Sequence, residues 1–168
     1  MTLPAVGETK PWADPQVVSI NRLGMRSPLI SYRDAESART NNRAKSPWFQ
    51  TLNGTWAIKR FTDVNDIHPT DLTEDATKWS TISVPGNWTL ANLGDEPHYT
   101  NVTMPWPGRP PSLPPTIATA IHRTTFSIPA TWKTRKTILN LGGAESVHIV
   151  YVNGTFVGYG TDSRLPSE

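Results

Sequence analysis

Prolines occur along the whole of this chain and limit what it can fold into. The sequence has 16 prolines among 168 residues, about twice the usual share of roughly 5%. Because proline lacks an amide donor and its ring clashes with the preceding helical turn, it interrupts helices and the interior of sheets. Charged residues make up 18% of the chain, against about 25% in an average domain. This composition favours short strands joined by ordered loops over long helices.

Strand patterns begin after residue 49. The clearest lies at 147–152 and 155–159, where two β-rich runs are joined by Asn153-Gly154. This dipeptide accepts positive φ at both central turn positions, so it predicts a type I′ hairpin. Four further strands are predicted at 52–58, 81–84, 122–128 and 136–141. In 52–58, the pattern places Trp56 and Ile58 on one face.

The order of these elements indicates the fold class. No strand–helix–strand alternation occurs in the sequence, so we predict an all-β fold, an antiparallel β-sandwich of the jelly-roll kind. The last hairpin ends at Gly160, and residues 161–168 contain no further strand pattern. Because such a sandwich would expose an unpaired edge, we expect the domain to be completed by polypeptide beyond Glu168.

Residues 1–48 have a different character and are predicted to form an extended N-terminal arm with short helical turns, ahead of a domain at 49–168. A short helix is expected at 34–39, and Ser46-Pro47-Trp48 resembles a helix start with Ser46 as N-cap. A disordered tail is the alternative for residues 1–30. Against it, their apolar side chains favour an arm that packs on a partner surface; these are Trp12, Val17, Val18, Ile20, Leu23, Leu29 and Ile30.

Charge and composition argue against several classes of partner. The formal net charge is +2 and the basic residues are scattered, so a nucleic-acid surface is not indicated. No stretch approaches the ~20 apolar residues of a membrane span, and no signal peptide is recognisable. Cysteine is absent, which excludes thiolate metal sites and disulfides. We therefore expect a cytoplasmic protein.

Residue patterns alone predict little catalytic chemistry. The four histidines are too widely spaced for a recognisable metal site, and no pair of carboxylates is identifiable. Seven tryptophans could stack on sugar rings, although a tryptophan is more often part of a core. Two polar clusters, 99–103 and 160–164, flank predicted strand ends, where loops present functional groups. Asp162 in the second cluster could equally cap a turn.

At these clusters the sequence resembles the family 2 β-galactosidases of bacteria. The resemblance is carried by 158–168 (Gly-Tyr-Gly-Thr-Asp-Ser-Arg-Leu-Pro-Ser-Glu) and 99–105 (Tyr-Thr-Asn-Val-Thr-Met-Pro). It continues, in order, through 52–56 and 84–88, and the arm segments Asn21-Arg22-Leu23 and Ala38-Arg39-Thr40 are also similar. Nearly the whole chain is covered. The Asp-Ser-Arg-Leu-Pro-Ser-Glu run favours galactosidases over the β-glucuronidases and β-mannosidases that share the architecture.

The resemblance implies a sugar-binding jelly-roll domain, followed in the parent enzyme by an immunoglobulin-like domain and a catalytic barrel. It implies that Asn101 hydrogen-bonds the bound galactosyl unit, and that Asp162 contacts the sugar and helps to hold a sodium ion. Amide and carboxylate groups suit these roles. The catalytic glutamates and the Mg²⁺ ligands would lie beyond Glu168. Residues 12–15 resemble an arm segment that touches a further Mg²⁺ in some members, but Pro11 stands where a carboxylate is expected.

Two expectations follow for the whole protein. The parent enzyme would hydrolyse β-galactosides such as lactose with retention, and would be a homo-oligomer with Mg²⁺ and Na⁺ as cofactors and subunit contacts from residues 1–30. The alternative from another class is a stand-alone carbohydrate-binding module. The residues that follow Glu168 would separate the two, because the enzyme requires barrel strands and the module does not.

Overall fold

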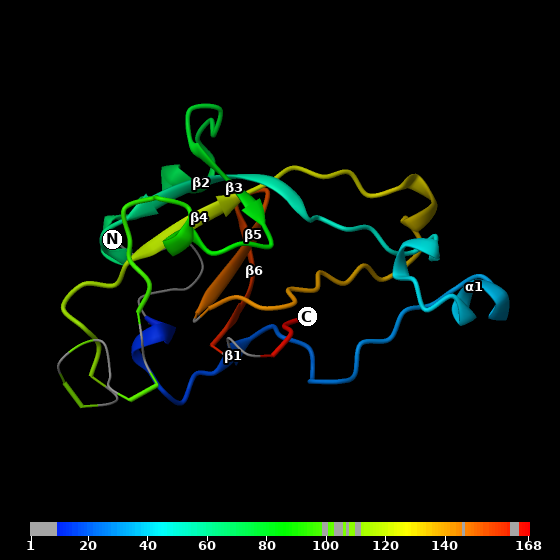
Figure 1. The fold of residues 1–168 in the computed structure, drawn as a ribbon, viewed down its shortest axis with the longest axis horizontal. Coiled ribbons are helices and arrows are strands. Elements are labelled where there is room, and N and C mark those ends of the chain that lie inside the picture. Colours follow the sequence, from blue (N-terminus) through cyan, green and yellow to red (C-terminus); the bar gives the residue numbers. More distant parts are fainter. Residues whose placement is uncertain are drawn as a thin grey trace.

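The computed structural model describes residues 10–98, 101–102, 106, 108–109, 112–145, 147–161 and 165–168. In this part of the chain, two three-stranded antiparallel sheets form the centre of the molecule (Figure 1). The strands are β1 (Ser19–Ile20), β2 (Gly54–Phe61), β3 (Ser80–Val84), β4 (Thr119–Arg123), β5 (His148–Val152) and β6 (Thr155–Gly160). The one α-helix described is α1 (Ala35–Arg39), and 3-10 turns lie at Pro11–Ala13, Arg43–Lys45, Val64–Asp66, Pro69–Leu72, Trp88–Leu90 and Ala130–Trp132. The predicted all-β, antiparallel class is confirmed, while the jelly-roll topology remains an expectation.

The first sheet has the order β3-β2-β4, with β2 at its centre. Ile58 of β2 pairs with Ser80 on one side and His122 on the other. Its side chain is only 2% exposed, and Ile82 of β3 is 5% exposed. Trp56 is half-buried, and its indole nitrogen donates to the Leu52 carbonyl at 2.7 Å. The predicted strands at 52–58 and 81–84 are thus confirmed, with their apolar residues on the packed face.

The second sheet has the order β1-β6-β5 and contains the predicted hairpin. Asn153 and Gly154 have φ values of 51° and 77°, which is the pair of positive angles that a type I′ turn requires. On its other edge, β6 pairs with β1 of the arm, with Ser19 opposite Gly160. The arm therefore supplies the third strand of this sheet.

A small core joins the two sheets. Val64 and Ile67, in the turns after β2, are 8% and 3% exposed. Side chains from both sheets and from the start of the arm pack around them: Trp12, Phe61, Ile117, Ile121, Ile149, Tyr151 and Phe156. The Tyr151 and Phe156 rings meet edge to face with centroids 5.9 Å apart, a favoured arrangement of aromatic quadrupoles.

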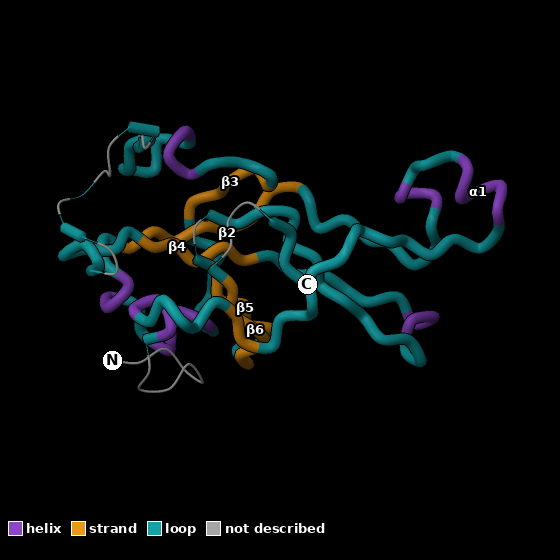
Figure 2. The backbone as a smooth tube through the Cα atoms, turned by 90° about the horizontal axis from the view of Figure 1, so that it is seen from below, coloured by secondary structure: helices purple, strands orange, loops and turns teal. Residues whose placement is uncertain are grey.

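A second group of segments projects away from the sheets. Helix α1 and the turns that follow it extend to one end of the molecule, alongside the loop after β4 (Figures 1 and 2). Asp34 caps α1 by accepting from the Ser37 amide at 2.7 Å, so the helix predicted at 34–39 is confirmed. Trp132 donates to the Pro47 carbonyl at 3.0 Å, and the Arg135 guanidinium lies 4.2 Å from the centre of the Trp48 ring.

Three local predictions were wrong. The strand predicted at 122–128 is Thr119–Arg123, because its register is determined by β2, where Phe61 pairs with Thr119 and Ala57 with Arg123. Residues 136–141 form no strand, and Leu141 alone makes an isolated bridge, to Ser167. Ser46 caps a turn and not a helix, since its Oγ accepts from the Trp48 amide at 3.1 Å and also donates to the Ser31 carbonyl.

Candidate functional site

The loop between β3 and β4 carries the first predicted sugar contact. Asn101 lies in a bend with Val102, and both residues are exposed. Val102 is 82% exposed, so this bend presents its side chains away from the small core. The structure thus places Asn101 on an accessible loop, as a residue that contacts a ligand requires.

Asp162 lies outside the described residues, so its proximity to Asn101 remains a prediction. The structure does describe the two segments that flank it, Thr161 directly after β6 and residues 165–168. Thr161 is held by the arm, since its amide donates to the Val18 carbonyl at 3.1 Å and its hydroxyl lies 3.3 Å from the same oxygen.

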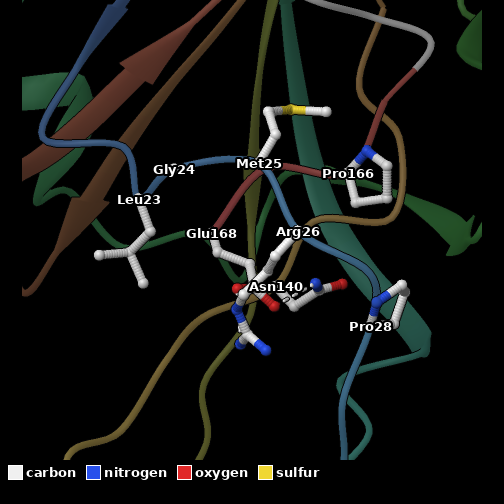
Figure 3. Close-up of a pocket in the computed structure, with 8 residues that line it drawn as sticks. All are labelled: Leu23, Gly24, Met25, Arg26, Pro28, Asn140, Pro166 and Glu168. Carbon is white, nitrogen blue, oxygen red and sulfur yellow. Dashed lines mark hydrogen bonds and ion pairs between the residues drawn. The ribbon is translucent and has the colours of Figure 1, made fainter.

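The arm also binds the segment that follows. Arg22 Nη2 donates to the Pro166 carbonyl at 2.9 Å, and the Leu23 amide donates to the Glu168 carbonyl at 2.7 Å. Arg26 Nη2 lies 2.8 Å from Glu168 Oε2 in an ion pair whose side chains are 38% and 15% exposed. Figure 3 shows Arg26 and Glu168 at a small pocket, whose other lining residues are Leu23, Gly24, Met25, Pro28, Asn140 and Pro166. We call the contacts of Val18, Arg22, Leu23 and Arg26 with Thr161, Pro166 and Glu168 the arm clasp.

The same segment is anchored from its opposite side. The backbones of Ser167 and Leu141 exchange two hydrogen bonds of 2.8 Å, and Asn140 Nδ2 donates to Glu168 Oε1 at 3.1 Å. Ser167 is 7% exposed, and its Oγ lies 3.0 Å from His148 Nε2. Burial, together with the Arg22 charge, lowers the pKa of His148. Residues 166–168 are thereby fixed between the arm and residues 140–141.

A second polar cluster lies beside β2 and has a structural role. Lys59 Nζ is 2.6 Å from both Asp71 Oδ1 and Glu74 Oε1, and the Trp79 indole donates to Glu74 at 3.0 Å. Arg123 stacks on the Trp79 ring at 4.4 Å and donates to the carbonyls of Asp71 and Glu74. Every charge here has a partner within the chain, so the cluster ties β2 and β4 to the turns between β2 and β3.

Metal ligation was predicted at Asp162, which the described residues do not include. Within the described ranges, no group of three or more His, Asp or Glu side chains gathers in a way that could hold a metal ion. At the arm segment 12–15, Pro11 is buried and begins a 3-10 turn. The carboxylate of Asp14 there accepts from the Gln16 amide at 2.9 Å. Among all the residues that the structure describes, no helix has the length and apolar character that crossing a membrane requires.

Comparison with known proteins determines the family. The family described as glycosyl hydrolases family 2, sugar binding domain, matches residues 49–168. This chain belongs to glycosyl hydrolase family 2. The matched region runs from just before β2 to Glu168. It therefore includes every strand of both sheets except β1, which belongs to the arm.

Curated relatives extend the similarity to the arm. A β-galactosidase of Enterobacter cloacae is 37% identical over 100% of this chain. β-Galactosidases of Yersinia pestis bv. Antiqua (strain Angola) and Yersinia pseudotuberculosis serotype O:1b (strain IP 31758) are each 34% identical over the same extent. The chain spans 16% of the length of each of these three proteins. The family 2 similarity therefore includes residues 1–48 as well as the sugar-binding domain.

Sequence reasoning missed the residues of the arm clasp. Arg22 lies in a segment that resembled the family, and Pro166 in the run that favoured galactosidases, but nothing in either pattern indicated that these two residues are in contact. Arg22 and Pro166 are 144 positions apart. We predicted that the arm packs on a partner surface. The pairing of β1 with β6 shows that part of the surface that the arm contacts belongs to the same chain.

Proposed function

We propose that this chain is the N-terminal, sugar-binding part of a β-galactosidase that hydrolyses terminal, non-reducing β-D-galactose residues, as in lactose, with retention of configuration. The observation that carries the proposal is the similarity to β-galactosidases over 100% of the chain, at 34% to 37% identity. The match of residues 49–168 to the family 2 sugar-binding domain gives the chain its part in that reaction.

In this function Asn101 and Asp162 recognise the sugar. The amide of Asn101 can donate to one hydroxyl and accept from another, while the carboxylate of Asp162 accepts from hydroxyls or offers an oxygen to Na⁺. Sodium bound there would neutralise part of the carboxylate charge. The glutamate nucleophile and the glutamate acid/base of a retaining hydrolase, with the Mg²⁺ ligands near them, belong to the barrel beyond residue 168.

The surface of the chain supports a larger parent. Large hydrophobic side chains are exposed on several elements of the described part, among them Val102 at 82%, Leu90 at 72% and Ile128 at 50%. Contact with other polypeptide would bury such side chains and remove their apolar surface from water. We propose that further domains of the same protein and a second subunit cover parts of it, in a cytoplasmic homo-oligomer.

The first experiment uses the full-length protein with chromogenic β-galactosides. We expect Asp162→Asn to lower kcat/KM by about tenfold or more, because a hydrogen bond to a charged group is worth about 1.5–3 kcal/mol. Asn101→Ala should lower kcat/KM by about twofold to tenfold, because a hydrogen bond between neutral groups is worth about 0.5–1.5 kcal/mol. Asp75→Asn is the control, since Asp75 is an exposed carboxylate that accepts from the amide and hydroxyl of Thr77, far from both site residues in sequence. Unchanged kinetics in both site variants would contradict the assigned roles.

Further measurements separate the alternatives. A panel of β-glucuronides and β-mannosides tests the other family 2 specificities, and turnover of either in preference to galactosides would replace the proposed substrate. The purified 168-residue chain should hydrolyse nothing, because it supplies no nucleophile. Turnover by that chain beyond the contribution of host enzyme would refute this. A coding sequence that stops soon after residue 168 would favour a stand-alone binding module.

A further inference from the structure

Leu141 and Ser167 begin an antiparallel ladder beside the last residues of this chain. Their backbones exchange two hydrogen bonds of 2.8 Å in an antiparallel bridge. Along such a ladder, pairs that exchange both bonds alternate with pairs whose backbones are not bonded to each other and whose side chains lie closer together. Asn140 and Glu168 are the next pair, and their side chains do meet, since Asn140 Nδ2 donates to Glu168 Oε1 at 3.1 Å (Figure 3). The ladder therefore continues for one position beyond the bridge.

The backbone of Glu168 points as this ladder requires. In a pair that is not hydrogen-bonded, each carbonyl faces away from the opposite strand. The Glu168 carbonyl accepts from the Leu23 amide at 2.7 Å, on the side of the arm. Figure 1 shows the C-terminus between the arm and the segment that leads into β5. Glu168 thus lies between two segments, with residues 140–141 along one edge of its backbone and the arm along the other.

The segment before Leu141 has unpaired backbone groups in the direction in which the ladder runs. Within the part of the chain that the structure describes, no hydrogen bond is found for the backbones of Thr137, Ile138 or Leu139. Residues 136–141 have the alternating pattern of a strand, but without a partner they form none. Ile138 is 40% exposed. A row of unpaired amides and carbonyls on residues with a strand pattern is a template for pairing with a further strand.

We infer that the residues directly after Glu168 pair with this segment in the parent protein. The register follows from the bridge, so that position 169 lies opposite Leu139, position 170 opposite Ile138 and position 171 opposite Thr137. The inference rests on the proposed function only in that the parent, like the relatives of which this chain spans 16%, is longer than this chain and continues past residue 168. The added residues form the middle strand between residues 136–141 and the arm.

The following residues of the same chain fit this edge better than a second copy does. They continue directly from Ser167 and Glu168, whose places in the ladder are already fixed, so no loop has to close. A second copy would have to give up its translational and rotational freedom on binding. The continuation of the chain is therefore the occupant whose pairing costs the least entropy.

Disulfide cross-linking in the full-length protein tests the register. Pairs that are not hydrogen-bonded have Cα atoms about 4.5 Å apart, a separation that a disulfide spans. Ile138→Cys, combined with cysteine at position 170, should therefore form a disulfide under mild oxidation, in a background without other cysteines. The matched control has the second cysteine at position 171 and should not link, because neighbouring side chains of a strand point to opposite faces. Asn140→Cys with Glu168→Cys should link as the calibrating pair, and mass spectrometry identifies the linked peptides.

Each outcome decides the inference. Linkage at position 170 within one chain supports it, whereas linkage at 171 alone, no linkage at 170, or linkage between two subunits would overturn it. The amides of Thr137 and Leu139 should also exchange at least about tenfold more slowly than in the unfolded chain, and unprotected amides would count against the pairing. Activity on a chromogenic β-galactoside is measured separately. An inactive protein that links at 170 would overturn the proposed function and leave the pairing standing, and an active protein that fails to link would do the reverse.

Discussion

At the scale of single residues, Asp71 shows how this small domain accommodates a buried charge. Asp71 is only 6% exposed, and burial by itself raises the pKa of a carboxyl. The hydrogen bond from Lys59 and that from the His68 amide outweigh this effect, so the pKa of Asp71 is lowered overall. Hydrogen bonds to Asp71 and Glu74 in turn raise the pKa of Lys59.

Replacing Asp71 by asparagine should therefore destabilise the fold by about 1.5–3 kcal/mol, the net value of a hydrogen bond to a charged group. The measurement is urea unfolding of the chain at neutral pH. Asp75→Asn should have a much smaller effect, because Asp75 is exposed and its hydrogen bonds come from the nearby Thr77. Equal losses in the two variants would show that the ion pair does not stabilise the fold.

The lowered pKa of Asp71 also predicts part of the pH dependence of the free energy of unfolding. Because its pKa is lower in the folded chain than the ordinary value of 3.8, its contribution to stability is complete above that value. It is lost as the pH falls through the lower, folded pKa. The unfolding free energy of the wild type should decline more steeply below pH 3.8 than that of Asp71→Asn, in the same urea titrations. Parallel curves would contradict the assignment.

At the scale of elements, the turn of the β5–β6 hairpin rests on Gly154. Its φ is +77°, and a Cβ at this position would lie 3.1 Å from Thr73 Cγ2. A left-handed conformation costs a residue with a Cβ about 1–2 kcal/mol. The glycine is thus required both by the type I′ turn and by the close approach of the turn after Leu72.

Gly154→Ala should lower the free energy of unfolding by about 1–2 kcal/mol, measured by urea denaturation. Gly142→Ala is the control, because a Cβ added at Gly142 would meet no other atom within 4 Å and the φ there is not positive. Its effect should stay within about 0.5 kcal/mol. If Thr73→Ser restores part of the loss, the close contact contributes. An unaffected hairpin would mean that the turn relaxes to another type.

At the scale of the whole molecule, the arm combines anchored backbone with exposed apolar side chains. Val18 is 57% exposed although its carbonyl holds Thr161, and Leu29 is 76% exposed. At Val18 the arm therefore contacts its own domain through a backbone hydrogen bond, while the Val18 and Leu29 side chains stay exposed. This arrangement suits an arm that also contacts a second subunit.

Val18→Ser combined with Leu29→Ser should weaken the homo-oligomer that we propose for the full-length protein, since burial of one such side chain contributes about 1.5–3 kcal/mol. Sedimentation velocity should show a dissociation constant raised by about tenfold or more. Leu90→Ser, at a position 72% exposed outside the arm, is the control. An unchanged oligomer, after this double substitution or after deletion of residues 1–30, would remove the arm from the interface.

Much of this chain could be predicted from its sequence because the relevant interactions are local. The turn at Asn153-Gly154 and the Asp34 cap of α1 depend on neighbouring residues, so the pattern was sufficient. The strand at 119–123 was misplaced because its ends are set by hydrogen bonds to β2, and the residues of β2 are far from this strand in the sequence. Asn101 and Asp162 came from the resemblance to family 2, and their meeting at one sugar remains to be measured.

Sequence by itself determined the all-β class, the hairpin and the family of this protein. Only the tertiary structure decided that the arm becomes a strand beside β6 and that Arg22 and Arg26 reach residues 166–168. The physical reason is that a turn or a cap is selected by the backbone preferences of a few adjacent residues. The partner of an arginine in an irregular arm is selected by where the whole chain folds back on itself.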